Sequence, residues 1–414
     1  MRCCAGQVGL IATVTPPSHP RPKMVDVKRV DLVWFNAGGG HRAAAQALEQ
    51  EILAQGRPWQ VRKVNLTEAL DPSMLFKRMT GIEPEDIYNK RLASGFTLGL
   101  AQELKLLQAI IRLGHQPLVQ RLQRHWQVTR PDLVVSLVPN FNRCMHDSLL
   151  LARPGVPFVT VMTDMADHPP GFWIEPGLQQ HVICGTAHAQ AQALAAGCPP
   201  RRVHRATGMI LRPEFHVAPR LDAVQRVAAR LEAGLDAHTP TGLVLFGGTG
   251  SRVMKRIAAR LPQTPLILMC GRNEQLAREL RALPANAPRI VVSYTGEVMR
   301  WMQLADFFIG KPGPGSLSEA VQMGLPVIVT RNAWTLPQER WNTEWVQQHG
   351  LGVVQRSFAD IQHGVDQITR RLDEYRSHVQ AMDNRAVSEV PRILQRILSD
   401  TTAACRAQQA TSWA

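Results

Sequence analysis

The sequence lacks the features of a membrane-spanning, metal-clustered or disulfide-stapled protein. No apolar run approaches the roughly 18 residues that a transmembrane helix needs. The seven cysteines are scattered without metal-ligand spacing, which predicts thiols that are mostly buried in a reducing compartment. Residues 1–23 are rich in proline and carry only a short apolar patch, so they do not form a convincing signal peptide.

Acidic residues are also scarce: 33 face 47 basic ones, for a formal charge of +14. This balance favours an anionic partner, such as nucleic acid, an anionic membrane surface or a phosphorylated substrate. A composition bias with a solvated basic surface is the alternative. Aromatic residues make up only 6%, and no helix-turn-helix, zinc-finger or RNA-binding signature occurs, so we expect no nucleic-acid partner.

Glycine-rich turns follow three apolar runs, at residues 36–41, 247–251 and 311–315. Each turn leads into a helix-compatible stretch, as in α/β domains that hold phosphate at a helix N-terminus. None fits G-x-G-x-x-G, so a dehydrogenase is disfavoured. For the third turn, Ser316 as N-cap and Glu319 in a capping box give a purely structural alternative of similar weight.

Two further places carry groups suited to proton transfer. His41 falls in the first turn of a predicted helix, where it either transfers a proton or only hydrogen-bonds the turn. Asp164 and His168 lie in a loop beyond a predicted strand, where α/β folds bind ligands. Asp164 alternatively orients a histidine or bonds to backbone.

The order of these elements predicts two α/β units joined by a short linker at residues 207–213, with a ligand cleft between them. We expect a tail at 1–23, an N-terminal domain at 24–212, a C-terminal domain at 213–398 and a flexible tail at 399–414. Met24 is an alternative start. Residues 98–128 form an amphipathic, basic helical stretch that either lies on a membrane surface or packs on the sheet.

Six short motifs follow one another over residues 28–355. They are Gly38-Gly39-Gly40-His41-Arg42, residues 159–164 with His168-Pro169, Thr207-Gly208 with Arg212-Pro213 and Phe215, Cys270-Gly271-Arg272-Asn273, Lys311 with Gly313-Pro314-Gly315 and Glu319-Ala320, and Gln338-Glu339 with Asn342. Their order resembles that of family-28 glycosyltransferases of GT-B fold, and in particular of the bacterial and plant diacylglycerol glycosyltransferases, including the monogalactosyldiacylglycerol synthases. Trp341 departs from the pattern, since a small residue usually stands there; Pro312 and Ile210 are further departures.

The resemblance implies two Rossmann-like domains facing each other across a cleft, and inverting transfer of galactose or glucose from a UDP-sugar to diacylglycerol. No Asp-x-Asp motif is present, so we expect no metal and no cofactor, with backbone N–H groups and helix dipoles holding the leaving diphosphate. The expected catalytic residues are His41, Asp164 and His168, and Gly38, Gly39 and Gly40 form a phosphate or acceptor loop. The expected UDP-sugar residues are Gly248, Thr249, Gly250, Ser251, Arg272, Asn273, Gly313, Pro314, Gly315, Ser316, Glu319 (at the ribose), Gln338, Glu339 (both at the sugar) and Asn342.

Two other enzymes of the same fold stay open. One transfers N-acetylglucosamine to another lipid, and the other is a nucleotide-sugar 2-epimerase that needs no acceptor. The expected location is cytoplasmic, with peripheral attachment to an anionic inner membrane surface.

Overall fold

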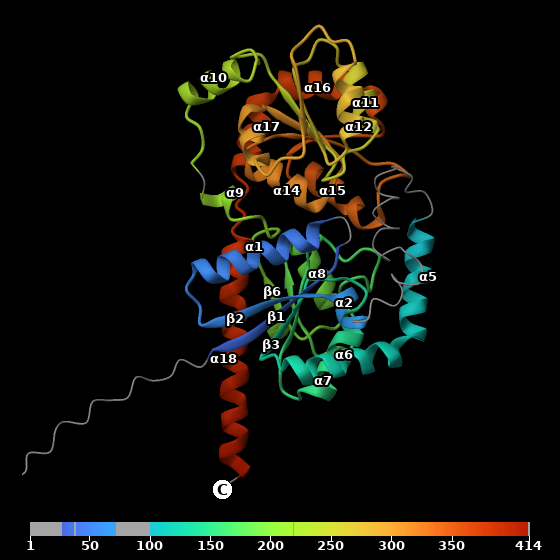
Figure 1. The fold of residues 1–414 in the computed structure, drawn as a ribbon, viewed down its shortest axis with the longest axis vertical. Helices are drawn as coiled ribbons and strands as arrows, with labels where there is room; N and C mark the ends of the chain where they lie inside the picture. Colours follow the sequence, from blue (N-terminus) through green and yellow to red (C-terminus); the bar gives the residue numbers. More distant parts are fainter. Residues whose placement is uncertain (1–26, 37–38, 72–99, 218, 413–414) are drawn as a thin grey trace, which may run out of the picture.

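The computed structural model describes residues 27–36, 39–71, 100–217 and 219–412. The predicted tail at 1–23 and Gly38 lie outside these ranges. The described chain forms two lobes, one above the other in Figure 1, and each lobe is built on a six-stranded parallel sheet. The predicted α/β class with two Rossmann-like units is therefore confirmed.

The sheet of the N-terminal lobe has the order β2-β1-β3-β4-β5-β6. Val30 on the interior strand β1 lies opposite Val61 on one side and Leu133 on the other. The middle of β1 and the whole of β3 are buried on both faces, as interior parallel strands require, whereas the edge strand β2 is largely half-buried. The strands are β1 (Lys28–Trp34), β2 (Trp59–Asn65), β3 (Leu133–Ser136), β4 (Phe158–Val161), β5 (His181–Cys184) and β6 (Val203–Arg205).

Helices cover both faces of this sheet. One face packs against α1 and the last helix, α18, through side chains such as Leu48 and Ile393; the other packs against α6 and α7 through Leu122 and Met145. The helices are α1 (Gly40–Ala54), α2 (Leu66–Leu70), α5 (Leu100–Leu113), α6 (His115–Thr129), α7 (Asn142–Ala152), α8 (Ala187–Ala195) and α18 (Ala386–Ser412), with a 3₁₀ turn at Pro200–Arg202.

The sheet of the C-terminal lobe has the order β12-β11-β10-β7-β8-β9, which is the strand order of dinucleotide-binding folds. Leu243 and Val244 on β7 point into two different cores, one on each face. The strands are β7 (Gly242–Leu245), β8 (Leu266–Gly271), β9 (Arg289–Ser293), β10 (Phe307–Gly310), β11 (Val327–Thr330) and β12 (Gly352–Gln355).

The remaining elements surround this second sheet. They are α9 (Glu214–Val217), α10 (Ala223–Glu232), α11 (Val253–Arg260), α12 (Glu274–Arg281), α13 (Val298–Leu304), α14 (Pro314–Gln322), α15 (Arg340–Gln348), α16 (Ile361–Arg370) and α17 (Leu372–Gln380), with 3₁₀ turns at Pro337–Glu339 and Phe358–Asp360.

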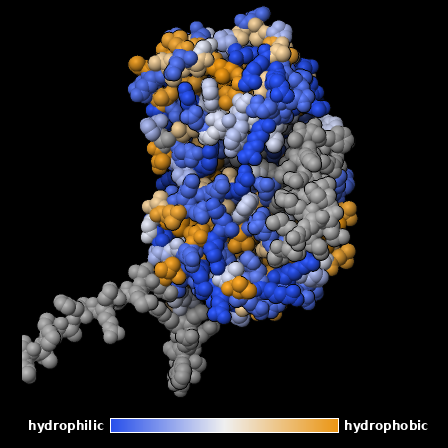
Figure 2. Space-filling model, in the orientation of Figure 1, coloured by the Kyte–Doolittle hydropathy of each residue, from blue (hydrophilic) through white to orange (hydrophobic). Residues whose placement is uncertain are grey.

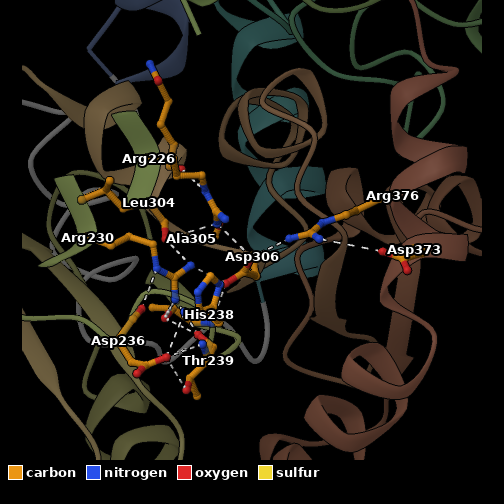
Figure 3. Close-up of polar contacts among 12 residues, drawn as sticks. Arg226, Arg230, Asp236, His238, Thr239, Leu304, Ala305, Asp306, Asp373 and Arg376 are labelled. Carbon is orange, nitrogen blue, oxygen red and sulfur yellow. Dashed lines mark hydrogen bonds and ion pairs between the residues drawn. The ribbon is translucent and has the colours of Figure 1, made fainter. Parts of the chain in front are cut away.

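A buried carboxylate fixes three of these elements together at the end of β10 remote from the cleft (Figure 3). Asp306 accepts hydrogen bonds from Arg226 and Arg230, each at 2.8 Å, and from Arg376 on α17. Burial alone would raise the pKa of Asp306, but the hydrogen bonds and charges of the arginines, Arg230 first, hold it below its usual range. The cluster stabilises the lobe and takes no part in the cleft.

The last helix crosses back to the N-terminal lobe, where it packs beside α1 (Figure 1). It also holds the linker, because the backbone N–H and hydroxyl of Thr207 both donate to Glu389, at 2.7 and 3.0 Å. The predicted domain division left this helix with the C-terminal domain. It includes residues 399–412, which the sequence predicts as a flexible tail.

The capping box predicted at Ser316 and Glu319 is wrong. The helix α14 begins three residues earlier than that cap requires, at Pro314, with Gly313 as N-cap and no side-chain cap. Proline has a fixed φ and no N–H to satisfy, so it is well suited to the first helical turn.

Candidate active site in the cleft

A cavity of about 730 Å³ lies between the two lobes. It is bordered by turns at the carboxyl ends of β1, β7, β8, β9, β10, β11 and β12, the edge at which parallel sheets bind ligands. The lining residues are Asn36, Gly39, Arg42, Phe246, Gly247, Gly248, Thr249, Gly250, Ser251, Val253, Arg256, Arg260, Arg272, Tyr294, Lys311, Pro312, Thr330, Asn332, Trp334, Thr335, Leu336, Glu339, Ser357, Phe358 and Ala359.

The glycine-rich turns of the two lobes face this one cavity. Gly39 and Arg42 reach it from the N-terminal lobe, and Lys311 and Pro312 reach it from the turn before α14. In the C-terminal sheet the turns after β7 and β10 flank the point where strand order reverses, the usual ligand position in such folds. A shared cavity between the junctions at His41 and at Glu319 is thus present.

Two glycine turns in the C-terminal lobe touch each other directly. A Cβ atom added to Gly271 would lie 2.2 Å from the carbonyl oxygen of Gly248, and its φ of +57° is one that side chains disfavour. The backbone N–H of Arg272 donates to the same oxygen at 3.0 Å. Glycine at 271 therefore allows the two turns to form one continuous floor.

The lining is strongly basic. Five cations line the cavity (Arg42, Arg256, Arg260, Arg272 and Lys311), whereas Glu339 is its only carboxylate among the described residues. Lys311 pairs with Glu339 at 2.6 Å, and no described carboxylate pairs with the four arginines. The guanidinium of Arg272 instead lies 4.7 Å from the ring centre of Tyr294. This charge suits an anion such as a diphosphate.

His41 lies just behind the lining, in the first turn of α1. Its Nδ1 is 3.0 Å from the Thr163 hydroxyl at the end of β4, and its ring stacks on Phe35 with centroids 4.9 Å apart. The surrounding protein lowers the pKa of His41 to about 4, although a backbone hydrogen bond at Leu137 opposes that shift. The imidazole is therefore neutral at pH 7.

Asp164 is joined to His41 through Trp173. The indole N–H of Trp173 donates to Asp164 at 2.9 Å, and its ring centre is 6.0 Å from that of His41. Burial raises the pKa of Asp164 to about 7; the Trp173 hydrogen bond lowers it, Glu339 raises it and Lys311 lowers it. Asp164 thus faces the Lys311–Glu339 pair across the boundary between the lobes.

The loop after β4 is held by several hydrogen bonds. Asp167 accepts the backbone N–H groups of Gly171 and Trp173, and the side chain of Gln192 on α8 bonds both the N–H and the carbonyl of Asp167. His168 is half-buried, and it adds to the lowering of the pKa of His188 on α8 that burial causes. It does not line the cavity.

Several predicted nucleotide residues have structural partners in this state. The Asn273 side chain caps α12 by accepting from the Leu276 N–H, and the buried Asn342 amide donates to the Pro312 carbonyl at 2.7 Å. Glu319 faces the linker: burial raises its pKa to about 7, Arg212 opposes that rise and Glu214 adds to it.

The predicted site residues divide accordingly. Those that line the cavity are Gly39, Gly248, Thr249, Gly250, Ser251, Arg272 and Glu339; those that do not are Gly40, His41, Asp164, His168, Asn273, Gly313, Pro314, Gly315, Ser316, Glu319, Gln338 and Asn342. Sequence reasoning left Arg42, Arg256, Arg260 and Lys311 out of the site. Arg42 and Lys311 stood inside the motifs, and Arg256 and Arg260 share one helix face at i, i+4 spacing after a glycine turn. Among the described residues no group of three or more His, Cys, Asp or Glu side chains is placed to hold a metal.

Comparison with known proteins supports the resemblance. Residues 41–210 match the family model described as monogalactosyldiacylglycerol (MGDG) synthase. A probable monogalactosyldiacylglycerol synthase 2 of Oryza sativa subsp. indica is 28% identical over 351 residues, which are 80% of this chain and 71% of that protein. The predicted resemblance, and with it the prediction of an enzyme of the glycosyltransferase class, is confirmed.

Solved structures show the fold. MurG of Acinetobacter baumannii has a TM-score of 0.53 and 15% identity, covering 89% of this chain and 99% of its own. A UDP-GlcNAc 2-epimerase of Neisseria meningitidis, bound to UDP-GlcNAc, has a TM-score of 0.56 and 12% identity, covering 90% of this chain and all of its own. The predicted GT-B arrangement of two Rossmann-like lobes is confirmed.

Proposed function

Since the chain is a glycosyltransferase of GT-B fold that resembles the monogalactosyldiacylglycerol synthases, we propose that it transfers a hexose, galactose or glucose, from a UDP-sugar to diacylglycerol. The observation that carries this proposal is the single basic cavity lined from both lobes by glycine-rich turns. Such a cavity can hold a nucleoside diphosphate on one side and bring an acceptor from the other.

In this proposal the diphosphate lies over the turns that precede α11 and α14. Backbone N–H groups of the turn at residues 248–251, which lines the cavity, donate to its oxygens, and Arg272 and Lys311 supply positive charge. The N-terminus of α14 adds its helix dipole from behind the lining. These groups are fixed before the reaction, so they stabilise the charge that develops on the leaving diphosphate. We propose on this basis that transfer needs no metal.

The acceptor hydroxyl attacks the anomeric carbon from the face opposite the diphosphate, so the configuration inverts. The bond from carbon to the diphosphate oxygen breaks, its electron pair stays on that oxygen, and the hydroxyl proton passes to a protein base. We assign this base to His41, because its imidazole is neutral and stands at the boundary of the lobes. Asp164, with a pKa near 7, supports the same site.

A membrane surface supplies the acceptor in this proposal. No described helix is both long and apolar enough to cross a bilayer. The helix α5, however, exposes Leu106, Ile110 and Leu113 by 61%, 56% and 89%, next to Lys105 and Arg112. In Figure 2 hydrophobic side chains appear at the right-hand edge, where Figure 1 places α5. An apolar stripe beside cations suits an anionic lipid surface.

The test is purified protein with diacylglycerol liposomes and a panel of UDP-sugars, read by mass spectrometry of the lipids. A hexosyl-diacylglycerol product supports the proposal. A UDP-sugar altered in the absence of lipid would favour a 2-epimerase, whose fold is shared, and a product only with N-acetylglucosamine and another lipid would favour the other transferase.

A further inference from the structure

An aromatic contact joins the two lobes beside the cleft. The ring of His188, in the first turn of α8, stacks on Trp341, in the first turn of α15, with centroids 4.5 Å apart and planes within 10° of parallel. Burial lowers the pKa of His188, which Glu344 opposes and His168 reinforces, so the stacked ring is neutral at pH 7. Trp341 is itself half-buried against the core of the C-terminal lobe.

On the N-terminal side, His188 belongs to the rigid unit that carries Asp164. The Thr186 hydroxyl at the start of α8 donates to the Met165 carbonyl, one residue after Asp164. Gln192, one turn further along α8, bonds both backbone groups of Asp167. A movement of α8 therefore moves the whole loop after β4.

On the C-terminal side, Trp341 belongs to the unit that carries the donor turn. Its neighbour Asn342 is fully buried and donates to the Pro312 carbonyl at 2.7 Å. Glu339, two residues before Trp341, pairs with Lys311. The start of α15 and the turn before α14 therefore move together.

From these contacts the structure assigns His188 and Trp341 as positioning residues: their stack sets the spacing of the lobes at which Asp164 faces Lys311 and Glu339. Asp164 also interacts electrostatically with Lys311 and Glu339, and these two opposite charges partly cancel in their effect on Asp164. A parallel ring pair adds a directional attraction that those charges lack. The inference rests on the proposed function for one of its two tests, the turnover of glycolipid synthesis; the other test does not depend on activity.

The kinetic test compares His188→Ala, His188→Phe and the control His363→Ala, an exposed histidine on α16. His188 is exposed and alanine favours helices, so His188→Ala should fold normally. We expect kcat to fall about two- to tenfold, the effect of losing one ring pair. The Kd for UDP should stay within about twofold, because most of the cavity lining belongs to the C-terminal lobe. His188→Phe should restore kcat, and His363→Ala should leave it unchanged.

The second readout needs no activity. In protein labelled with 5-fluorotryptophan, the ¹⁹F resonance of Trp341, assigned with Trp341→Phe, should shift in His188→Ala and stay in place in His363→Ala. A Trp341 resonance unmoved by His188→Ala, or a normal kcat in that variant, would overturn the assignment. If the wild-type protein made no glycolipid, the proposed function would fail while the resonance alone still decided the stack.

Discussion

At the scale of single residues, the surroundings of the cleft shift the pKa values of two titratable groups in opposite directions. Burial pushes the pKa of His41 down to about 4 and that of Asp164 up to about 7, so both uncharged forms are favoured in the same environment. Trp173 lies between them and fixes the carboxyl by its indole N–H. Both groups are then available for proton transfer without a buried net charge.

Replacing His41 by alanine should reduce kcat by about 10²–10⁴-fold, the usual contribution of a general base. Folding should persist, because the ring is removed from a half-buried position and the helix gains an alanine. The measurement is initial rate with saturating UDP-sugar, beside His363→Ala as control. A near-normal kcat for His41→Ala would remove His41 from the mechanism.

Asp164→Asn should change how stability depends on pH. Between about pH 4 and pH 7 the folded Asp164 keeps a proton that the unfolded chain has lost, so the wild-type protein loses stability as pH rises through that interval. The Asp164→Asn variant does not lose stability in this way, because asparagine does not titrate. The variant should therefore gain about 1–3 kcal/mol over wild type at pH 8 and nothing near pH 4.

Urea unfolding at the two pH values measures this difference. The Trp173 N–H can still donate to the asparagine carbonyl, so the comparison isolates the charge. An equal difference at both pH values would contradict a raised pKa for Asp164.

Residue roles were the least predictable part of the sequence. The type and spacing of Ser316 and Glu319 allow a capping box, but Pro314 starts the helix earlier. Asn273 lies in a motif shared with the family and yet caps α12. A polar side chain near a turn can bond either to the local backbone or to a ligand. The position of the neighbouring backbone decides between the two, and the sequence pattern does not give that position.

At the scale of elements, hydrophobic runs predicted the central strands well. The edge strands β6 and β12 were not predicted, because polar residues and a glycine leave only one or two apolar residues in each run. The stripe over 98–128 splits at Gly114: Leu122 and Trp126 on α6 are buried, whereas Leu106 and Ile110 on α5 are exposed. The packing alternative therefore holds for α6, whereas α5 is exposed and its attachment to a membrane surface stays a prediction.

The contact between the two glycine turns makes a sharp prediction. Gly271→Ala forces a Cβ against the Gly248 carbonyl and holds a disfavoured φ, so the turn that carries Gly248–Ser251 must shift. We expect the Kd for UDP to rise at least about tenfold, because N–H groups that bind phosphate act only when placed within a few tenths of an ångström.

The matched control is Gly296→Ala, where an added Cβ meets no atom within 4 Å. Calorimetric titration of UDP against both variants gives the comparison. Equal affinity of Gly271→Ala and Gly296→Ala for UDP would show that this turn does not hold the diphosphate.

At the scale of the whole molecule, two sheets, a linker and a crossing helix define the shape. The two lobes and their shared cleft follow from strand order and glycine turns, which local sequence encodes. The return of α18 to the first lobe does not, because its apolar side chains fit either lobe equally well by periodicity alone. The hydrogen bonds from Thr207 to Glu389 then tie the linker to α18.

The net charge of +14 and the exposed face of α5 lead to one prediction for the molecule as a whole. Binding to vesicles should require anionic lipid and weaken with salt, because exposed charges are screened within about 10 Å at 0.1 M. Leu106→Glu should reduce vesicle binding several-fold, since it places a carboxylate at the lipid surface. Leu231→Glu, at a site of similar exposure on α10 (59% against 61%), should not.

Sedimentation with neutral and anionic vesicles at two salt concentrations separates the two contributions. If charge alone attracts the protein, both leucine variants should bind equally and only salt should matter. If α5 inserts, Leu106→Glu should also slow glycolipid synthesis on vesicles while leaving the Kd for UDP unchanged, because α5 does not line the cavity. Equal sedimentation of the two variants at low salt would therefore contradict the proposal that α5 inserts into the lipid surface that supplies the acceptor.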